Sequence, residues 1–288
     1  MNRSTALHPH PCGAPVATPI GRPIASFSHL VHAKTMKIES PQSWIVRTEL
    51  EKAAYDNGWR IPHEENDGWL IRESATAPGE VALAGCGQSG PWALSINHRG
   101  VAAELGQPHE GLTGPGIASY VVATIGELHA LLSRVYDLSI ALPDDPLRRF
   151  EDRTSSLPKT TEAERLVVQR VGQNIFRDSL MRFWNKRCPL TGIAEPDLVR
   201  ASHMKPWAKC KSDAERLDVF NGLLLSALWD ATFDAGLVSF TDVGEPLWSP
   251  ALSEASRDHL ERTMTGVLQL SPGHLPYLAF HRDQEFKA

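Results

Sequence analysis

The chain has 288 residues, of which 42% are hydrophobic and 22% are charged, and its formal net charge at pH 7 is −5. These proportions are typical of a globular protein in water, and the length allows two modest domains. The acidic balance excludes a general attraction to nucleic acid, so a surface that binds nucleic acid has to be a local patch. Because no apolar run is long enough to span a bilayer, we expect no membrane partner.

The four cysteines are scattered along the chain, at positions 12, 86, 188 and 210. They lack the paired spacing of a zinc knuckle, so no structural zinc is expected. They also do not form a disulfide framework, and this pattern favours a reducing, cytoplasmic location. Cys188 and Cys210 could in principle share a zinc ion. Because no third and fourth soft ligand lies nearby, small buried hydrophobic side chains are the better interpretation.

The N-terminal half divides into a leader and a folded unit. Residues 1–35 are rich in Pro, Ala, Ser, Thr and His and lack the apolar core of a signal peptide, so we expect a disordered leader. Residues 36–142 predict one compact α+β domain, with helical periodicity first, short strand-like segments next and a closing helix. The expected helices cover 44–56 and 124–136, and the expected strands cover 68–71, 79–84 and 91–96.

Three tryptophans, Trp59, Trp69 and Trp92, lie in or beside the expected strands. Packing in the core and at its rim is the favoured interpretation. The alternative is an aromatic pocket that stacks a flipped or modified base. No family resemblance accompanies this domain, so its recognition role is unassigned.

Residues 143–159 contain Pro-Asp-Asp-Pro and Thr-Ser-Ser-Leu-Pro, which predict a linker crossed by few contacts. A long helix is expected from Thr161 to Lys186, with Thr161 and Glu164 as a capping box. This helix is the densest basic segment of the chain. Its polar face is either a solvated surface or a set of phosphate contacts that lead nucleic acid to a cleft. The candidate contacts are Arg170, Gln173 and Arg177, together with Lys205 further along the chain.

The C-terminal half alternates short apolar runs with polar blocks. A short strand at 198–202 is expected to deliver His203, and Pro206 ends it because proline cannot pair in a ladder. The elements expected next are a polar loop at 208–219, a strand at 223–225, a helix at 229–235, a hairpin of 237–240 with 246–248, and a helix at 253–264.

Three side chains in these blocks suit cleavage of a phosphodiester bond, which needs an activated water and a counter-charge for the transition state. His203 can accept a proton from water near neutral pH. Asp230 offers oxygen ligands to a hard divalent cation. Asn221 can brace the loop through bonds from its amide to the backbone. In a hairpin followed by a helix, we expect all three to reach one cleft.

Each of these residues also has a structural interpretation. A histidine on an apolar strand, such as His203, is often a packed core residue, and Asp230 could be a helix N-cap. Asn221 precedes Gly222, and Asn-Gly is a strong turn signal that is compatible with bracing. Asp234 shares a helix face with Asp230, so it is either a second ligand or a solvated residue at the helix end.

These blocks, which include Ala201-Ser-His-Met-Lys-Pro-Trp207, resemble the HNH nuclease superfamily over residues 164–240. The resemblance is greatest to the restriction-type branch with a Ser-His-x-Lys-Pro-Trp signature. It implies a ββα-metal nuclease domain at 160–288 behind the N-terminal domain, and therefore an α+β chain overall. It also implies that His203 is the general base, that Asn221 braces the loop and that Asp230 binds the metal.

Two departures from the family pattern bear on the metal site. Many members carry an acidic residue or a histidine just before the catalytic histidine, whereas this chain has Ser202, a poorer ligand. Many also carry two Cys-x-x-Cys knuckles, and this chain has none. The candidate metal ligands are therefore Asp230, Asp234 and Ser202, with Mg²⁺ as the expected ion and Mn²⁺ as a substitute.

The resemblance implies a metal-dependent DNA endonuclease of restriction or phage-defence type. Its single site would cut one strand at a time, so double-strand breaks would require a homodimer or sequential nicks. The alternative function is that of a non-cleaving protein on a degenerate HNH fold, which recognises modified DNA or a nucleotide signal. Ser202, in place of a stronger ligand, is the feature that supports this alternative.

Overall fold

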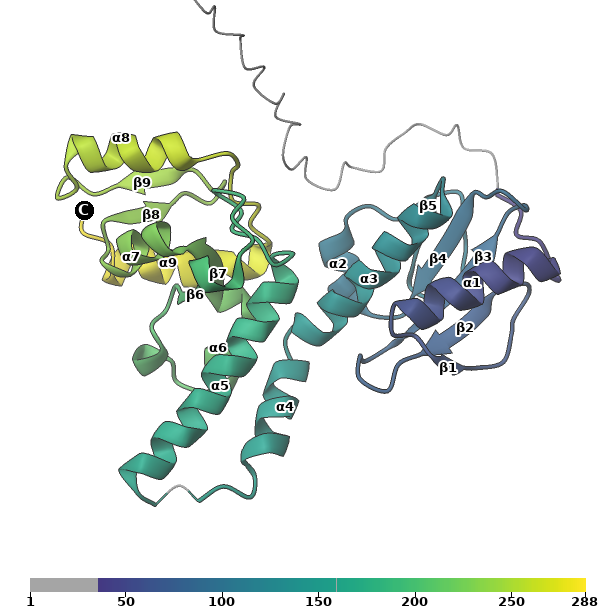
Figure 1. Ribbon diagram of the computed structural model, residues 1–288, viewed down its shortest axis with the longest axis horizontal. Coiled ribbons are helices and arrows are strands. Elements are labelled where there is room, and N and C mark those ends of the chain that lie inside the picture. The colour runs from purple at the N-terminus through teal and green to yellow at the C-terminus, as the bar shows by residue number, and fades with distance from the viewer. Residues whose placement is uncertain (1–35, 159) are drawn as a thin grey trace, which may run out of the picture.

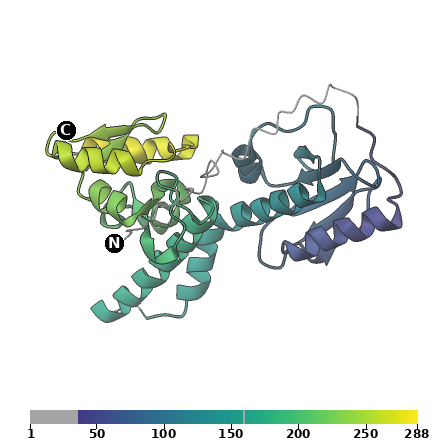
Figure 2. The same ribbon diagram turned by 45° about the horizontal axis from the view of Figure 1, so that its top comes forward.

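A computed structural model describes residues 36–158 and 160–288. The leader expected at 1–35 lies outside the described residues. The described chain forms two lobes, joined by the run of helices α3 to α5 (Figure 1). The same connection is seen from a second direction in Figure 2. Helices and strands occur in both lobes, so the expected α+β class is confirmed.

The N-terminal lobe contains one antiparallel sheet whose strands follow chain order. Each strand pairs with the next along the chain, so the sheet is a meander with short connections. The strands are β1 (Ile61–Pro62), β2 (Leu70–Glu73), β3 (Glu80–Gly85), β4 (Trp92–Ile96) and β5 (Ala118–Val122).

Two helices cover one face of this sheet, α1 (Trp44–Asp56) and α3 (Ile125–Ala141), and they pack against each other. A short helix, α2 (Arg99–Leu105), lies between β4 and β5. The helices at 44–56 and 124–136 are thus confirmed, and the second continues to Ala141. The closing helix begins at a capping box formed by Thr124 and Glu127, in which each side chain bonds the other's backbone.

Trp59, Trp69 and Trp92 are all in the core, with at most 5% of their surface exposed. The indole nitrogen of Trp59 donates to the carbonyl of Leu132, 3.4 Å away, and its ring meets Tyr136 edge-on. Trp69 packs on the opposite face of the sheet, with Ala82 and Leu112. The interpretation as core packing is therefore confirmed. An aromatic pocket for a flipped base is wrong, because these rings are enclosed by the sheet and its covering segments.

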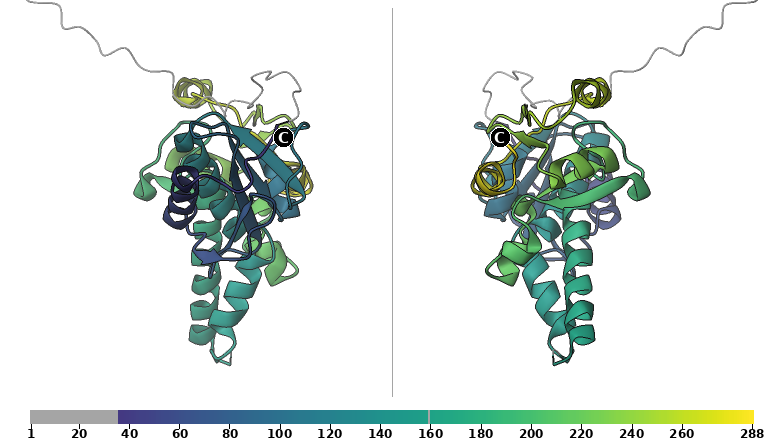
Figure 3. Two further views of the ribbon diagram at one scale, coloured as in Figure 1. Left: turned by 90° about the vertical axis from the view of Figure 1, so that its right-hand side faces the viewer. Right: turned by 90° about the vertical axis from the view of Figure 1, so that its left-hand side faces the viewer.

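The segment expected to be a linker contains a helix, α4 (Asp145–Thr154). Pro146 stands in its first turn, where the missing N–H costs nothing, so the proline starts a helix here. Phe150 is 4% exposed and anchors α4 in the core. Helix α5 (Glu162–Phe183) follows, and the expected capping box of Thr161 and Glu164 is present. The α4–α5 hairpin projects away from both lobes (Figure 3).

The expectation of few contacts across 143–159 is wrong. The guanidinium of Arg134 donates to the carbonyls of Arg182 and Phe183, at 3.0 and 2.9 Å. On the C-terminal side, the hydroxyl of Ser271 donates to Glu104 of α2 at 2.6 Å. One continuous group of buried apolar residues also extends from the first lobe into the second. The lobes therefore share packing as well as hydrogen bonds.

The C-terminal lobe contains a hairpin that lies between α5 and the helix that follows it. The hairpin strands are β6 (Val199–His203) and β7 (Gly222–Ser226), and the next helix is α7 (Ala227–Asp234). The expected second hairpin and the helix at 253–264 are confirmed. The remaining elements are α6 (Asp213–Leu217), β8 (Val238–Phe240), β9 (Pro246–Trp248), α8 (Glu254–Thr263) and α9 (Leu275–Gln284).

Candidate active site

The end of strand β6 holds two of the candidate residues on opposite faces of the hairpin. In the β6–β7 register, Ser202 is paired with Leu223 and His203 with Gly222. Consecutive side chains of a strand point to opposite faces. Accordingly, the hydroxyl of Ser202 donates to Asp230 of α7, whereas the ring of His203 stacks on Phe176 of α5. Strand β6 therefore separates the side chain of His203 from the pair formed by Ser202 and Asp230.

The imidazole of His203 is fixed by one hydrogen bond and two aromatic rings. Its Nε2 lies 2.9 Å from the carbonyl oxygen of Arg216. Its ring lies over that of Phe176, with 3.7 Å between centroids, and meets the edge of Trp207 at 5.7 Å. A carbonyl only accepts, so Nε2 carries the proton and Nδ1 keeps a lone pair. Burial lowers the pKa of His203 to about 4, so the ring is neutral at neutral pH.

Asn221 is fully buried and binds the loop that follows β6. Its Oδ1 accepts from the backbone nitrogen of Lys205 at 2.8 Å. Its Nδ2 donates to the carbonyls of Glu215 at 3.0 Å and Lys205 at 3.2 Å. These bonds hold the loop against the start of β7, and therefore hold the segment that supplies the Arg216 carbonyl to His203.

Two further residues support this loop, and sequence reasoning missed both. Asp218 accepts from the backbone nitrogen of Phe220 at 2.9 Å and from the hydroxyl of Tyr277 at 2.9 Å. It thereby caps the 3₁₀ turn Val219–Asn221 that carries the bracing asparagine. Burial raises the pKa of Asp218. The contact with Tyr277, which lies on α9 well beyond the motif, left no signal in local spacing.

The candidate metal ligands gather on the face of the hairpin that packs against α7. Asp230 is half-buried and accepts from Ser202, while Asp234 stands one turn further along the helix. Desolvation, followed by the negative charge of Asp230, raises the pKa of Asp234 to about 6. The N-cap of α7 is Ser226, so the interpretation of Asp230 as an N-cap is wrong.

The oxygen donors of this face suit a hard cation with few protein ligands. Within 36–158 and 160–288, no three or more His, Cys, Asp or Glu residues form a group that could hold a metal ion. Mg²⁺, however, keeps several waters and is commonly bound through one or two carboxylates together with substrate phosphate. The carboxylate of Asp230 and the hydroxyl of Ser202 fit that chemistry. Structural zinc sites are built from Cys and His side chains, which this pair does not supply.

The four candidate contacts to nucleic acid differ in their surroundings. Arg177 donates to the carbonyl of Val199 at 2.9 Å, so it anchors the start of β6. The amine of Lys205 is paired with Glu215 at 2.8 Å. Arg170 and Gln173 are exposed on α5. Of the four, the last two are thus the best placed to meet a ligand from solvent.

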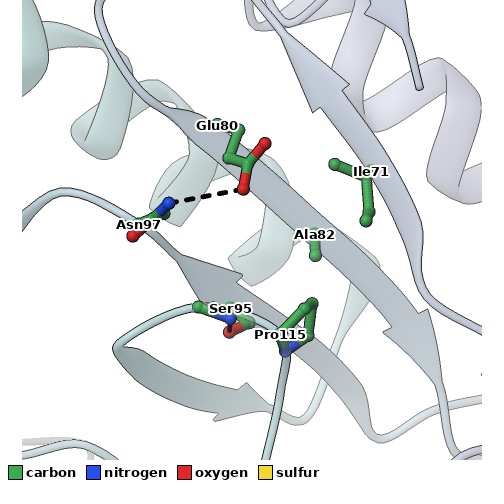
Figure 4. A pocket seen from close by; sticks show the side chains of 7 residues that line it. Ile71, Glu80, Ala82, Ser95, Asn97 and Pro115 are labelled. Carbon is green, nitrogen blue, oxygen red and sulfur yellow. Dashed lines mark hydrogen bonds between the residues drawn. The ribbon is translucent and has the colours of Figure 1, made fainter. Parts of the chain in front are cut away.

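A small pocket in the N-terminal lobe lies on the sheet face opposite α1 and α3 (Figure 4). Its polar groups are already bonded within the protein. Asn97 donates to Glu80 at 3.4 Å, and the hydroxyl of Ser95 accepts from the backbone nitrogen of Gly116 at 2.9 Å. The polar side chains of the pocket thus have partners within the protein, and none of them requires a ligand.

Comparison with known families gives one match, a family described as HNH endonuclease, over residues 188–241. No curated protein matches the chain. The matched segment contains β6, β7 and α7, and so includes His203, Asn221 and Asp230. Helices α5 and α9, which contact the site from outside, are not part of it. No helix in the described part of the chain is long and apolar enough to cross a membrane.

Proposed function

The chain belongs to the HNH endonuclease superfamily through residues 188–241, and on this premise we propose a metal-dependent DNA endonuclease of restriction or phage-defence type. An HNH endonuclease domain is a phosphodiester hydrolase, and DNA is its substrate. The dependence on metal, the biological role and the part played by each residue belong to the proposal.

The observation that carries the proposal is the state of His203. A general base must be neutral, must present a lone pair and must be held in place. The Arg216 carbonyl takes the Nε2 proton, and Nδ1 has no hydrogen-bond partner within 36–158 and 160–288. The ring also remains partly accessible at the end of its strand. These three features of His203 support its role as the general base. In the proposed mechanism, Nδ1 takes a proton from the attacking water.

The geometry at the end of β6 suggests where the phosphate binds. His203 faces α5, while Ser202 faces Asp230 on α7, so one phosphate can meet both sides only beyond the strand end. We place the scissile phosphate there, with water approaching from the His203 side. Asp230, oriented by Ser202, would hold Mg²⁺ or Mn²⁺, with Asp234 as a secondary ligand. When bound, such an ion stabilises negative charge on the phosphate and on the departing 3′ oxygen.

The lobes divide the work in this proposal. Residues 160–288 cleave, and residues 36–142 recognise a feature of the DNA or a signal. Exposed Arg170 and Gln173 on α5 would contact the DNA backbone, because phosphate contacts position a duplex without reading its sequence. The shared core means that recognition by the first lobe can be transmitted to α5 directly, through packed side chains.

The test is digestion of supercoiled plasmid, prepared both with and without base modification, in Mg²⁺ or Mn²⁺. We expect nicking that chelation abolishes. His203→Ala should reduce the rate by about 10²–10⁴-fold, because it removes the general base. The matched control is His259→Ala, since His259 is exposed on α8, away from the motif. Equal nicking by His203→Ala and the unchanged protein would exclude His203 as the base.

The alternative function, binding without cleavage, has a distinct outcome in the same experiment. Retarded migration of one plasmid form with no nicking in either ion would identify a DNA-binding protein on a degenerate nuclease fold. Neither binding nor nicking would point to an absent activator, and nucleotide signals added to the same digestion would then test that requirement.

A further inference from the structure

The base His203 is held by a residue outside the matched segment. Phe176 lies on α5, and its ring is 1% exposed. The two rings are 3.7 Å apart at their centroids and inclined by 15°, so the stack is nearly parallel. Helix α5 therefore forms one wall of the site, even though it precedes residue 188.

The space for this stack depends on a glycine. Gly222 is paired with His203 across the β6–β7 ladder. A Cβ at Gly222 would lie 2.5 Å from the Cζ of Phe176 and 2.8 Å from the Cδ1 of Leu180. Its φ of −147° is ordinary extended backbone, so the glycine is needed for space and not for conformation. The missing side chain opposite His203 thus admits the ring that covers the imidazole.

A second glycine on the same face of α5 makes room for the other wall. Gly172 and Phe176 are one helical turn apart. A Cβ at Gly172 would lie 2.6 Å from the Cη2 of Trp207, the ring that meets the edge of His203. Helix α5 therefore leaves space at Gly172 for the ring of Trp207, and it also contributes the ring of Phe176.

We propose that Phe176 is a positioning residue for His203, and this proposal rests on the proposed role of His203 as base. A single hydrogen bond at Nε2 leaves the imidazole free to turn about its χ2 torsion, which has broad preferences in histidine. The hydrogen bond excludes a half-turn, which would place a carbon at the Arg216 carbonyl, but smaller rotations would tilt the ring and turn the Nδ1 lone pair away from the strand end. The stack on Phe176 fixes the plane of the ring, and therefore the direction of the Nδ1 lone pair.

A second histidine of the same lobe, His281, is also stacked on a phenylalanine but has more polar contacts than His203. His281 lies on Phe233, with 3.8 Å between centroids and an inclination of 6°. Both of its ring nitrogens are engaged, Nδ1 with the hydroxyl of Ser239 at 2.9 Å and Nε2 with the carbonyl of Phe233 at 3.3 Å. His281 is thus fixed by two polar contacts and has a structural role. The ring of His203 has only one polar contact among the described residues, at Nε2, so the orientation of Nδ1 depends on the stack with Phe176.

The experiment compares Phe176→Leu with Phe183→Leu in the full chain. Phe183 is buried on the same helix and contacts His274, so its replacement removes a similar ring away from the base. The first readout is the ¹⁵N spectrum of histidine-labelled protein, with His203 identified by its loss in His203→Ala. We expect one Nε2–H tautomer in the unchanged protein and in Phe183→Leu. We expect a mixture of tautomers in Phe176→Leu.

The second readout separates turnover from binding. Phe176→Leu should lower kcat for plasmid nicking by roughly 10- to 100-fold, as expected for a misdirected base. KM should stay within about twofold, because DNA contacts are unchanged. If Phe176→Leu does not fold, Phe176→Met replaces it, since methionine fills a similar volume without a ring plane.

The two proposals fail in different ways. A variant that loses the ring of Phe176 but keeps a single Nε2–H tautomer and a normal kcat would overturn the positioning role. If the unchanged protein nicks no DNA in either ion, with or without added nucleotide signals, the proposed function fails, and the tautomer comparison still decides whether Phe176 orients His203.

Discussion

The hydroxyl of Ser202 donates a hydrogen bond to the carboxylate of Asp230, and so connects strand β6 to helix α7 beside the candidate base. Oδ1 of Asp230 accepts this bond, which leaves Oδ2 for an ion. A serine at this position is a poor ligand, yet it can orient a good one. Replacing a residue that orients a metal ligand typically weakens metal binding, even though that residue does not contact the ion.

Ser202→Ala should therefore lower the affinity for Mn²⁺ by about 10- to 100-fold, as replacements of orienting residues typically do. Isothermal calorimetry on the full chain measures it. Ser226→Ala is the matched control, because Ser226 is a buried serine at the end of β7 and its side chain makes no capping bond to α7. Equal affinities in the two variants would show that the hydroxyl of Ser202 has no part in the metal site.

Asp230→Asn should abolish Mn²⁺ binding in the same measurement, and Asp234→Asn should weaken it less. The reason is position, because Asp230 is half-buried and bonded to Ser202, whereas Asp234 is more exposed and lies one turn away. Both substitutions keep the size of the side chain, so a change reflects charge and not packing. A larger loss in Asp234→Asn than in Asp230→Asn would reverse the assignment of the main ligand.

The sequence predicted the elements that carry the site because their signals are local. Apolar runs bounded by Pro206 and by Gly222 predicted two short strands, and the structure has β6 and β7 there. The helix that carries Asp230 was predicted for the same reason, and Gly236 ends it with a φ of +67°. Local spacing also placed Asp230 and Asp234 on one helix face.

The walls of the site could not be predicted, because they come from distant segments. Nothing in the spacing of α5 distinguishes Phe176 from the other apolar residues that pack the core. Tyr277 is likewise separated from Asp218 by several elements, so its hydrogen bond has no local signature. The helix within 143–159 was missed for another reason. Three prolines and several charged residues favour a linker, and only the burial of Phe150 shows why a helix forms.

The contact between the lobes gives a prediction on stability. Arg134 of α3 donates to the carbonyls of Arg182 and Phe183 at the end of α5, and the carbonyl of Phe183 would otherwise lie partly buried without a donor. Arg134→Met keeps the aliphatic stem and removes the guanidinium. The substitution should lower the free energy of unfolding by roughly 2–3 kcal/mol, measured by urea denaturation, because it removes both hydrogen bonds that the charged guanidinium donates.

Arg153→Met is the control for Arg134→Met, since Arg153 is exposed near the end of α4.

The contacts between the lobes also predict that a fragment of residues 160–288 is less stable than the full chain, because α5 loses the side chains that α3 packs against it. A fragment as stable as the full chain would show that the contacts between the lobes contribute little.

Two buried histidines predict how stability depends on pH. Burial lowers the pKa of both His274 and His281 to about 4, from an ordinary value near 6.5. Between these values the unfolded chain binds protons that the folded chain excludes. These two histidines, together with His203, should therefore make the free energy of unfolding fall as the pH is lowered from 6.5 toward 4, and protonation of Asp234, whose pKa is raised to about 6, should offset part of that fall. Each histidine contributes a slope of at most about 1.4 kcal/mol per pH unit.

Urea denaturation of metal-free protein at pH 7.5, 6 and 5 measures this slope, and His281→Leu tests its origin. His281→Leu should be less stable at pH 7.5, because Ser239 loses its partner, but its stability should fall less steeply as the pH is lowered. His259→Leu, at an exposed position on α8, controls for the loss of a histidine as such. The assignment to His281 fails if its removal leaves the slope between pH 6 and 5 as steep as in the unchanged protein.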